Sequence, residues 1–125
     1  MEEGKIVFAK ESYNLVKAAY DIFNQLKFGY HEKYYQRAYE IELGKMGYKF
    51  IKEYKVDINY QSKNIGRYYF DFLVQDKIVV EFKVGSEFFT NHLKQVLSYL
   101  KSANKRLGII FLFTPTGVKY KRLVN

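Results

Sequence analysis

Two short apolar runs, residues 68–74 and 78–84, flank a polar tripeptide at 75–77 and constrain the fold more than any other stretch. Both runs are rich in aromatic and β-branched residues, which predicts two antiparallel strands joined by a three-residue loop. That loop sets the register so that Asp71 falls opposite Glu81. Alternation along the strands predicts two faces, one with Asp71, Glu81 and Lys83 and the other with Phe70, Phe72, Val80 and Phe82.

The predicted pair of carboxylates carries an electrostatic cost. Side chains directly across a ladder have Cβ atoms about 4.5–5.5 Å apart, so Asp71 and Glu81 would repel each other. The repulsion disappears if a divalent cation lies between them or if one carboxylate holds a proton. Two carboxylates beside the ammonium of Lys83 suit a Mg²⁺ site for phosphodiester chemistry. The alternative is that both acids are exposed strand residues and Lys83 is a solvated neighbour.

Size and composition set the class of the chain. The 125 residues are 48% hydrophobic, which predicts one domain covering residues 1–125. The absence of cysteine excludes disulfides, thiol catalysis and cysteine-ligated zinc. No apolar run approaches the roughly 18 residues of a membrane span, and the first residues lack the layout of a signal peptide. We therefore expect a cytoplasmic protein without a membrane partner.

Positive charge is concentrated in the C-terminal part. The formal net charge is +8, and no Asp or Glu follows Glu87. The cations of this segment are Lys94, Lys101, Lys105, Arg106, Lys119, Lys121 and Arg122. This asymmetry fits a polyanion held by the basic segment and presented to the acidic site, with Lys94 and Lys101 among the expected contacts. The alternative is a solvated, lysine-rich surface.

Hydrophobic periodicity predicts eight elements in the order α-α-β-β-β-α-β-β. The apolar run at 107–113 predicts a central strand, and the charged alternation at 118–122 predicts an edge strand. The expected helices cover about 12–27 (capped by Ser12), 31–45 and 87–103, and a turn is expected at 61–66. A helix between the third and fourth strands is a crossover candidate. The predicted fold class is α/β, a sandwich around a mixed central sheet.

Two helices carry further candidate site residues. Glu32 lies one turn before Tyr35 near the start of the second helix, where an acid commonly complements the helix dipole. Gln95 and Tyr99 lie four apart on the third helix and form a polar and aromatic edge. That edge either reaches a phosphate or base, or is simply a solvated flank.

Three motifs together resemble those of the PD-(D/E)XK nuclease superfamily. Residues 29–35 read as G-x-x-E-x-x-Y, and residues 95–99 read as Q-x-x-x-Y. Asp71 followed by Glu81-Phe82-Lys83 reads as the D…E-x-K core. Within the superfamily the chain looks like the small GxxExxY proteins, and the Q-x-x-x-Y motif resembles the RecB-type branch. The resemblance covers about residues 12–124, although Phe70 replaces the proline that precedes the aspartate in the superfamily pattern.

The resemblance implies a restriction-endonuclease-like α/β sandwich and a metal-dependent nuclease acting on DNA. It implies that Asp71 and Glu81 hold Mg²⁺ or Mn²⁺, that the Phe82 carbonyl completes the metal shell, and that Lys83 assists the attacking water. Glu32 would add a metal contact. Gln95 and Tyr99 would lie near nucleic acid.

Two other functions remain open from the sequence. One is a nucleic-acid-binding module that keeps the nuclease fold without cutting, using the basic segment and the tyrosines for phosphate contacts and stacking. The other is a partner protein whose site is vestigial. Because so small a chain has little surface beyond its site, we also expect a homodimer or a partner protein to contribute specificity.

Overall fold

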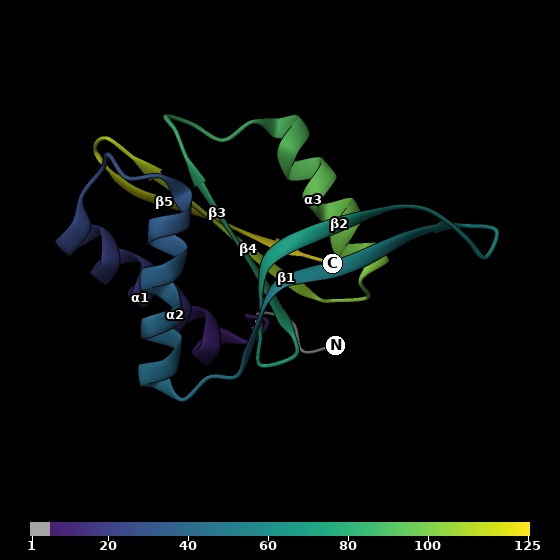
Figure 1. Cartoon of the computed structure of the whole chain (residues 1–125), viewed down its shortest axis with the longest axis horizontal. Helices are drawn as coiled ribbons and strands as arrows, with labels where there is room; N and C mark the ends of the chain where they lie inside the picture. The colour runs from purple at the N-terminus through teal and green to yellow at the C-terminus, as the bar shows by residue number, and fades with distance from the viewer. Residues whose placement is uncertain (1–5) are drawn as a thin grey trace.

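A five-stranded mixed sheet has two helices on one face and a third helix on the other (Figure 1). The computed structural model describes residues 6–125. The elements are α1 (Ala9–Leu26), α2 (Glu32–Met46), β1 (Phe50–Tyr60), β2 (Lys63–Val74), β3 (Ile78–Val84), α3 (Thr90–Ser102), β4 (Leu107–Thr114) and β5 (Gly117–Val124). Their order confirms the order predicted from the sequence.

The strands follow the order β1-β2-β3-β4-β5 across the sheet. Every pair is antiparallel except β3 and β4, which run parallel because α3 connects them across one face. Every residue of β4 is buried, as the continuous apolar run predicts. β5 lies at the edge of the sheet, as its charged alternation predicts.

Three predicted boundaries are wrong. The third helix, α3, begins at Thr90 and not near Glu87. Helix α1 begins at Ala9, and the backbone N–H of Ser12 donates to the Phe8 carbonyl at 2.9 Å, so Ser12 is a buried helical residue and not the N-cap. The turn expected at 61–66 contains only Gln61 and Ser62, which both have positive φ, as a two-residue hairpin turn requires. The residues that follow pair with β1 and lengthen the hairpin.

The predicted register of the β2–β3 hairpin is confirmed where the two strands pair. Phe72 pairs with Val80, and the two pairs after it continue to the three-residue loop. The ladder does not extend to Asp71 and Glu81. Instead, Asp71 Oδ2 accepts a hydrogen bond from the backbone N–H of Phe82 at 2.8 Å, so a side chain takes the place of a backbone acceptor as the strands part.

The predicted faces of this hairpin are wrong at one position. Phe72, Val80 and Phe82 pack on the α1/α2 face, but Phe70 packs on the α3 face. The alternation breaks beside an irregular position of β1. Glu53 has a φ of 52° and falls between the pairs Lys52–Phe72 and Tyr54–Phe70, so the two-stranded ribbon turns there.

The α1/α2 face holds the larger cluster of buried residues. At its centre, the buried Tyr39 donates a hydrogen bond to the Leu15 carbonyl at 3.0 Å and packs edge-on against Phe82 at 4.8 Å between ring centroids. Tyr35 is also buried and donates to the Lys27 carbonyl at 2.6 Å. These two hydroxyls join α2 to α1, and the Tyr35 bond fixes the turn that leads into α2.

The α3 face has a smaller cluster built on Val96 and Leu100. Gly108 of β4 lets α3 approach the sheet, because a Cβ at this position would lie 3.0 Å from Leu100 Cδ1 and 3.1 Å from Val79 Cγ2. Across residues 6–125, no helix is both long and apolar enough to cross a membrane.

Candidate active site

The proposed acids meet where β2 leaves β3. Glu81 is only 3% exposed, and its neighbours on β3, Val80 and Phe82, are both apolar and buried. Its Oε1 accepts a hydrogen bond from the Tyr68 hydroxyl at 2.6 Å, and Asp71 is held by the Phe82 N–H described above. The alternative that Glu81 is an exposed strand residue is therefore wrong.

Burial makes both acids reluctant to ionise. Burial raises the pKa of Glu81 to about 7, and repulsion from Asp71 adds to the rise, whereas the Tyr68 hydroxyl and the charge of Lys83 oppose it. Burial also raises the pKa of Asp71, although the Phe82 N–H opposes that rise. A nearby positive charge would therefore stabilise the ionised form of both carboxyl groups.

Lys83 and Glu32 are charges close enough to act on this pair. Lys83 is half-buried on β3, and its ammonium lowers the pKa of both acids. Glu32, in the first turn of α2, raises the pKa of both by repulsion. Glu32 also lines a pocket together with Val84, which places the start of α2 beside the end of β3. The structure therefore brings Lys83 near Asp71 and Glu81, and places Glu32 close enough to act on both acids through its charge.

The sequence did not single out Tyr68, which holds Glu81. Its hydroxyl faces the carboxylate, and burial followed by the charge of Glu81 raises the pKa of Tyr68 well above its usual value. Tyr99 of α3 stacks flat on the Tyr68 ring, with centroids 4.0 Å apart and planes 18° apart. The predicted hairpin does place Tyr68 and Glu81 on neighbouring strands, but alternation puts Tyr68 on the face of Phe70 and away from Glu81.

His92 also lies at this site, although no pattern in the sequence marks it as a ligand. Its Nε2 lies 3.9 Å from Glu81 Oε2. Burial and the charge of Lys83 lower the pKa of His92. At neutral pH the imidazole is therefore uncharged, and it lines the site as a polar neutral group.

The four residues predicted to bind nucleic acid separate into two pairs on α3. Gln95 is exposed and shares with Tyr99 the helix edge that borders the site. Lys94 and Lys101 are also exposed, but helical spacing places them on the other side of the buried stripe formed by Val96 and its neighbours. The structure therefore brings Gln95 and Tyr99 toward Glu81 and does not bring the two lysines there.

The donor set fits a small, hard cation. Within residues 6–125, no three His, Asp or Glu side chains converge as a ready metal cluster. Mg²⁺ does not need such a cluster, because it keeps several waters and binds through one or two carboxylates together with substrate phosphates. Asp71 and Glu81 are two carboxyl groups of this kind, and burial raises the pKa of each.

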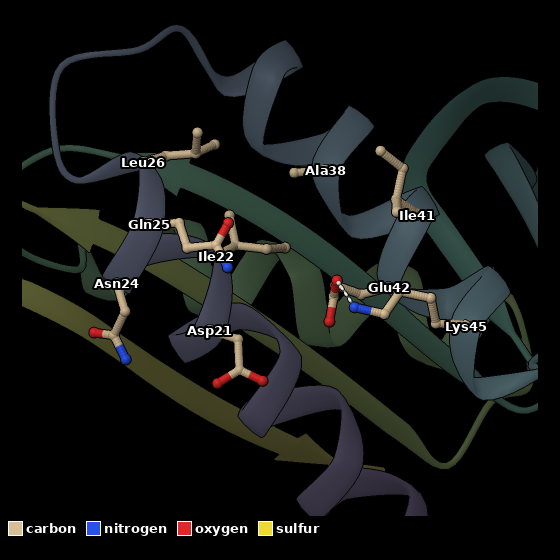
Figure 2. Close-up of a pocket in the computed structure, with 9 residues that line it drawn as sticks. All are labelled: Asp21, Ile22, Asn24, Gln25, Leu26, Ala38, Ile41, Glu42 and Lys45. Atoms are coloured by element: carbon tan, nitrogen blue, oxygen red, sulfur yellow. Dashed lines mark hydrogen bonds and ion pairs between the residues drawn. The ribbon is translucent and has the colours of Figure 1, made fainter.

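A separate pocket lies between α1 and α2 and contains none of the proposed site residues. Figure 2 shows its lining side chains, including the surface ion pair between Lys45 and Glu42 at 3.2 Å. Asp71, Glu81 and Glu32 do not line this pocket. The charged cluster at the β2–β3 junction is the stronger candidate site.

A mixed sheet with this element order, flanked by helices and carrying a D…E-x-K cluster, defines a nuclease-like α/β protein. A sequence model described as the PD-(D/E)XK nuclease superfamily matches residues 9–123, and the chain belongs to this superfamily. The restriction-endonuclease-like α/β sandwich expected from the sequence is therefore confirmed. The family supports a nuclease.

Solved structures share the fold at low sequence identity. One is an alkaline exonuclease from Laribacter hongkongensis, with a TM-score of 0.54 and 10% identity over 100% of this chain and 72% of that one. Another is SSO0001, with a TM-score of 0.52 and 16% identity over 94% of this chain and 78% of that one. A comparison with curated protein sequences finds no significant match.

Proposed function

We propose that the chain is a metal-dependent nuclease that hydrolyses phosphodiester bonds in DNA, and that it belongs with the GxxExxY proteins near the RecB-type branch. The observation that carries this proposal is the burial of Glu81 beside Asp71 and Lys83. A buried carboxyl group with a pKa of about 7 is a poor structural element by itself. It becomes useful when a cation and a phosphate complete the site.

The proposed metal ligands are Asp71 and Glu81, with Glu32 and the Phe82 carbonyl as further contacts. A bound Mg²⁺ or Mn²⁺ would polarise the phosphoryl oxygen and lower the pKa of a bound water. A carboxylate has about four acceptor sites, so the Phe82 N–H and the Tyr68 hydroxyl can orient these two acids and still leave oxygens for a ligand.

The proposed role of Lys83 is to stabilise negative charge during the reaction. Its ammonium lies close enough to influence both acids and His92, so it can donate a hydrogen bond to the attacking water or to a phosphoryl oxygen. Gln95 and Tyr99 border the same opening. The proposed contact with nucleic acid is made by the exposed Gln95 amide, because the ring of Tyr99 is already used in its stack with Tyr68.

The first test is a cleavage assay on labelled single-stranded, duplex, circular and branched DNA and on RNA, with Mg²⁺, Mn²⁺ or EDTA. We expect metal-dependent cutting of DNA that falls by about 10²–10³-fold in Lys83→Ala, as for the loss of one group that stabilises charge in a transition state. Lys77→Ala is a matched control, because Lys77 lies in the loop of the same hairpin and pairs with Glu11.

Cutting by Lys83→Ala at the native rate would contradict the assignment of the lysine. Salt-dependent retention of DNA without cutting, unaffected by EDTA, would instead favour the non-cleaving binding module. Preferential cutting of RNA would support the nuclease activity but contradict the assignment of DNA as its substrate.

A further inference from the structure

The outer halves of β1 and β2 extend past the rest of the sheet as a two-stranded ribbon, visible in Figure 1 as the teal hairpin that leaves the body. We refer to residues 55–69 as the β-arm. From Asp57 to Arg67 it contains no buried residue. From Lys63 to Phe70, β2 pairs with β1 alone, because its ladder with β3 covers only Phe72 to Val74. Residues 57–67 therefore extend beyond the core, whereas Val56 at the base of the arm is buried in it.

The β-arm begins at the candidate active site. Asp71 lies two residues after its end on β2, and Tyr68, which holds Glu81, is one of its residues. Nine residues separate Asp71 from Ser62 at the tip, which corresponds to about 30 Å of strand. Phosphates follow one another at about 3.4 Å along each strand of a duplex, so the tip would reach roughly nine base pairs from the scissile bond.

Charge on the β-arm favours a polyanion. Its ionisable side chains apart from tyrosine are the cations Lys55, Lys63 and Arg67 and the single anion Asp57. Asp57 lies 3.9 Å from Lys55 and pairs across the ribbon with Arg67, so Lys63 is the most independent of the three cations. Two copies of this arm placed together would repel, whereas a phosphate backbone would attract each one.

The tip combines polar side chains that can hydrogen-bond to bases with exposed apolar side chains. Tyr60 and Ile65 are 63% and 66% exposed. Around them lie the amide and hydroxyl side chains of Asn59, Gln61, Ser62 and Asn64. Asn and Gln amides can pair with the edge of an adenine, and apolar side chains can contact thymine methyl groups. The major groove of a duplex is about 12 Å wide and accepts a two-stranded ribbon.

The backbone of the tip is also unusual. Gln61 and Ser62 occupy the two central positions of the hairpin turn with φ values of 49° and 66°, where glycine or asparagine is normally favoured. A register shift between Ile58 and Asn59 adds a bulge just before the turn, and bulges bend a ribbon and re-aim its side chains. Both features cost stability, which favours a tip whose backbone serves to position side chains for binding a ligand.

From these observations we infer that the β-arm is a duplex-binding element that lies in the major groove of the substrate beside the cleavage site. The inference rests on the proposed function, because it assigns the substrate of that site as double-stranded nucleic acid. Lys63 and Arg67 contact phosphates, and the tip residues contact base edges. Substrate selection would then depend on the outer part of the β-arm, residues 57–67, which does not include Tyr68.

The test measures binding of a 20-base-pair DNA duplex and of one of its single strands by fluorescence anisotropy, in EDTA and at several salt concentrations. In one variant Lys63→Ala and Arg67→Ala are combined, and in a second a two-residue Asn-Gly turn replaces residues 59–65. The matched control combines Lys10→Ala and Lys45→Ala, which remove the same charge from exposed positions on α1 and α2.

We expect the double arm variant to weaken duplex binding at least tenfold relative to the control. The slope of log affinity against log salt should fall by roughly 1.8, the value for two lost phosphate contacts. The variant with the shortened tip should lose more affinity for the duplex than for the single strand. Circular dichroism should show both variants folded, because they alter only exposed side chains and turn residues.

Equal duplex affinity and salt slope in the arm variants and the control would overturn the inference. A change of sedimentation coefficient without a change in duplex affinity would also overturn it and assign the arm to self-association. Hydrolysis of bis(p-nitrophenyl) phosphate by the native chain tests the proposed function separately, because this small diester is too short to contact the tip of the arm while it is bound at the active site. A native chain that binds duplex through the arm but cleaves neither substrate would reject the hydrolysis alone.

Discussion

The two faces of the sheet use tyrosine hydroxyls in opposite ways. On the α1/α2 face, Tyr35 and Tyr39 donate to backbone carbonyls of the preceding helix and its end, so neutral polar groups satisfy one another and fix the packing. On the α3 face, Tyr68 donates to Glu81, a buried carboxyl group that also meets repulsion from Asp71. One face therefore uses its polar groups for stability, whereas the other maintains a charged cluster that stability alone does not require.

The largest effect expected from this contrast is a loss of stability on the α1/α2 face. Leu43 is fully buried on α2, so Leu43→Ala should reduce the free energy of unfolding by about 2–5 kcal/mol through lost transfer energy and a cavity. Ile41→Ala on the same helix is the control, because Ile41 is 66% exposed. Urea unfolding measures both. Equal losses in the two variants would remove the distinction between the packed face and the surface.

The α3 face should respond in activity more than in stability. Tyr68→Phe keeps the ring that stacks on Tyr99 but removes the hydroxyl that orients Glu81. We expect metal affinity and cleavage to fall by about 10–100-fold, as for the loss of a residue that orients a metal ligand. The measurement is the Mg²⁺ concentration that gives half-maximal cleavage.

Tyr13→Phe is the control for this variant, because Tyr13 is 69% exposed on α1. A purely structural role for Tyr68 would lower the unfolding midpoint and leave the metal concentration dependence unchanged. That outcome would make the two faces alike in their use of tyrosine.

The same contrast explains what the sequence could predict. Period and composition predicted every element and the hairpin register, because Phe72 and Val80 belong to continuous apolar patterns that only one pairing buries. The D…E-x-K residues were found by spacing and type. Their convergence in the structure agrees with the prediction, and their catalytic and metal-binding roles stay predictions.

Apart from the start of α1, the main features that the sequence could not predict depend on the strands and their twist. Phe70 left its expected face because Glu53 adopts a positive φ, and no residue pattern marks that position. Tyr68 and His92 reach Glu81 only after this turn and after α3 docks over Gly108. The β-arm was interpreted in part as a six-residue turn, because Gln61 and Ser62 lack the glycine that usually marks a two-residue hairpin.

The smallest predicted effect concerns a carboxylate on the α1 side whose pKa moves in the opposite direction to that of Glu81. A hydrogen bond from Lys77, 2.6 Å away, lowers the pKa of Glu11 below its usual 4.5. A lowered pKa in the folded state means that the pair stabilises the protein above pH 4.5 and loses this contribution as pH falls through the folded value. Because the pair is partly exposed, Glu11→Gln should cost no more than about 1 kcal/mol at pH 7 and nothing at pH 3. Urea unfolding at both pH values, with exposed Glu87→Gln as control, measures this difference. A cost above about 2 kcal/mol, or one that persists at pH 3, would show that the α1/α2 face also depends on a charged group.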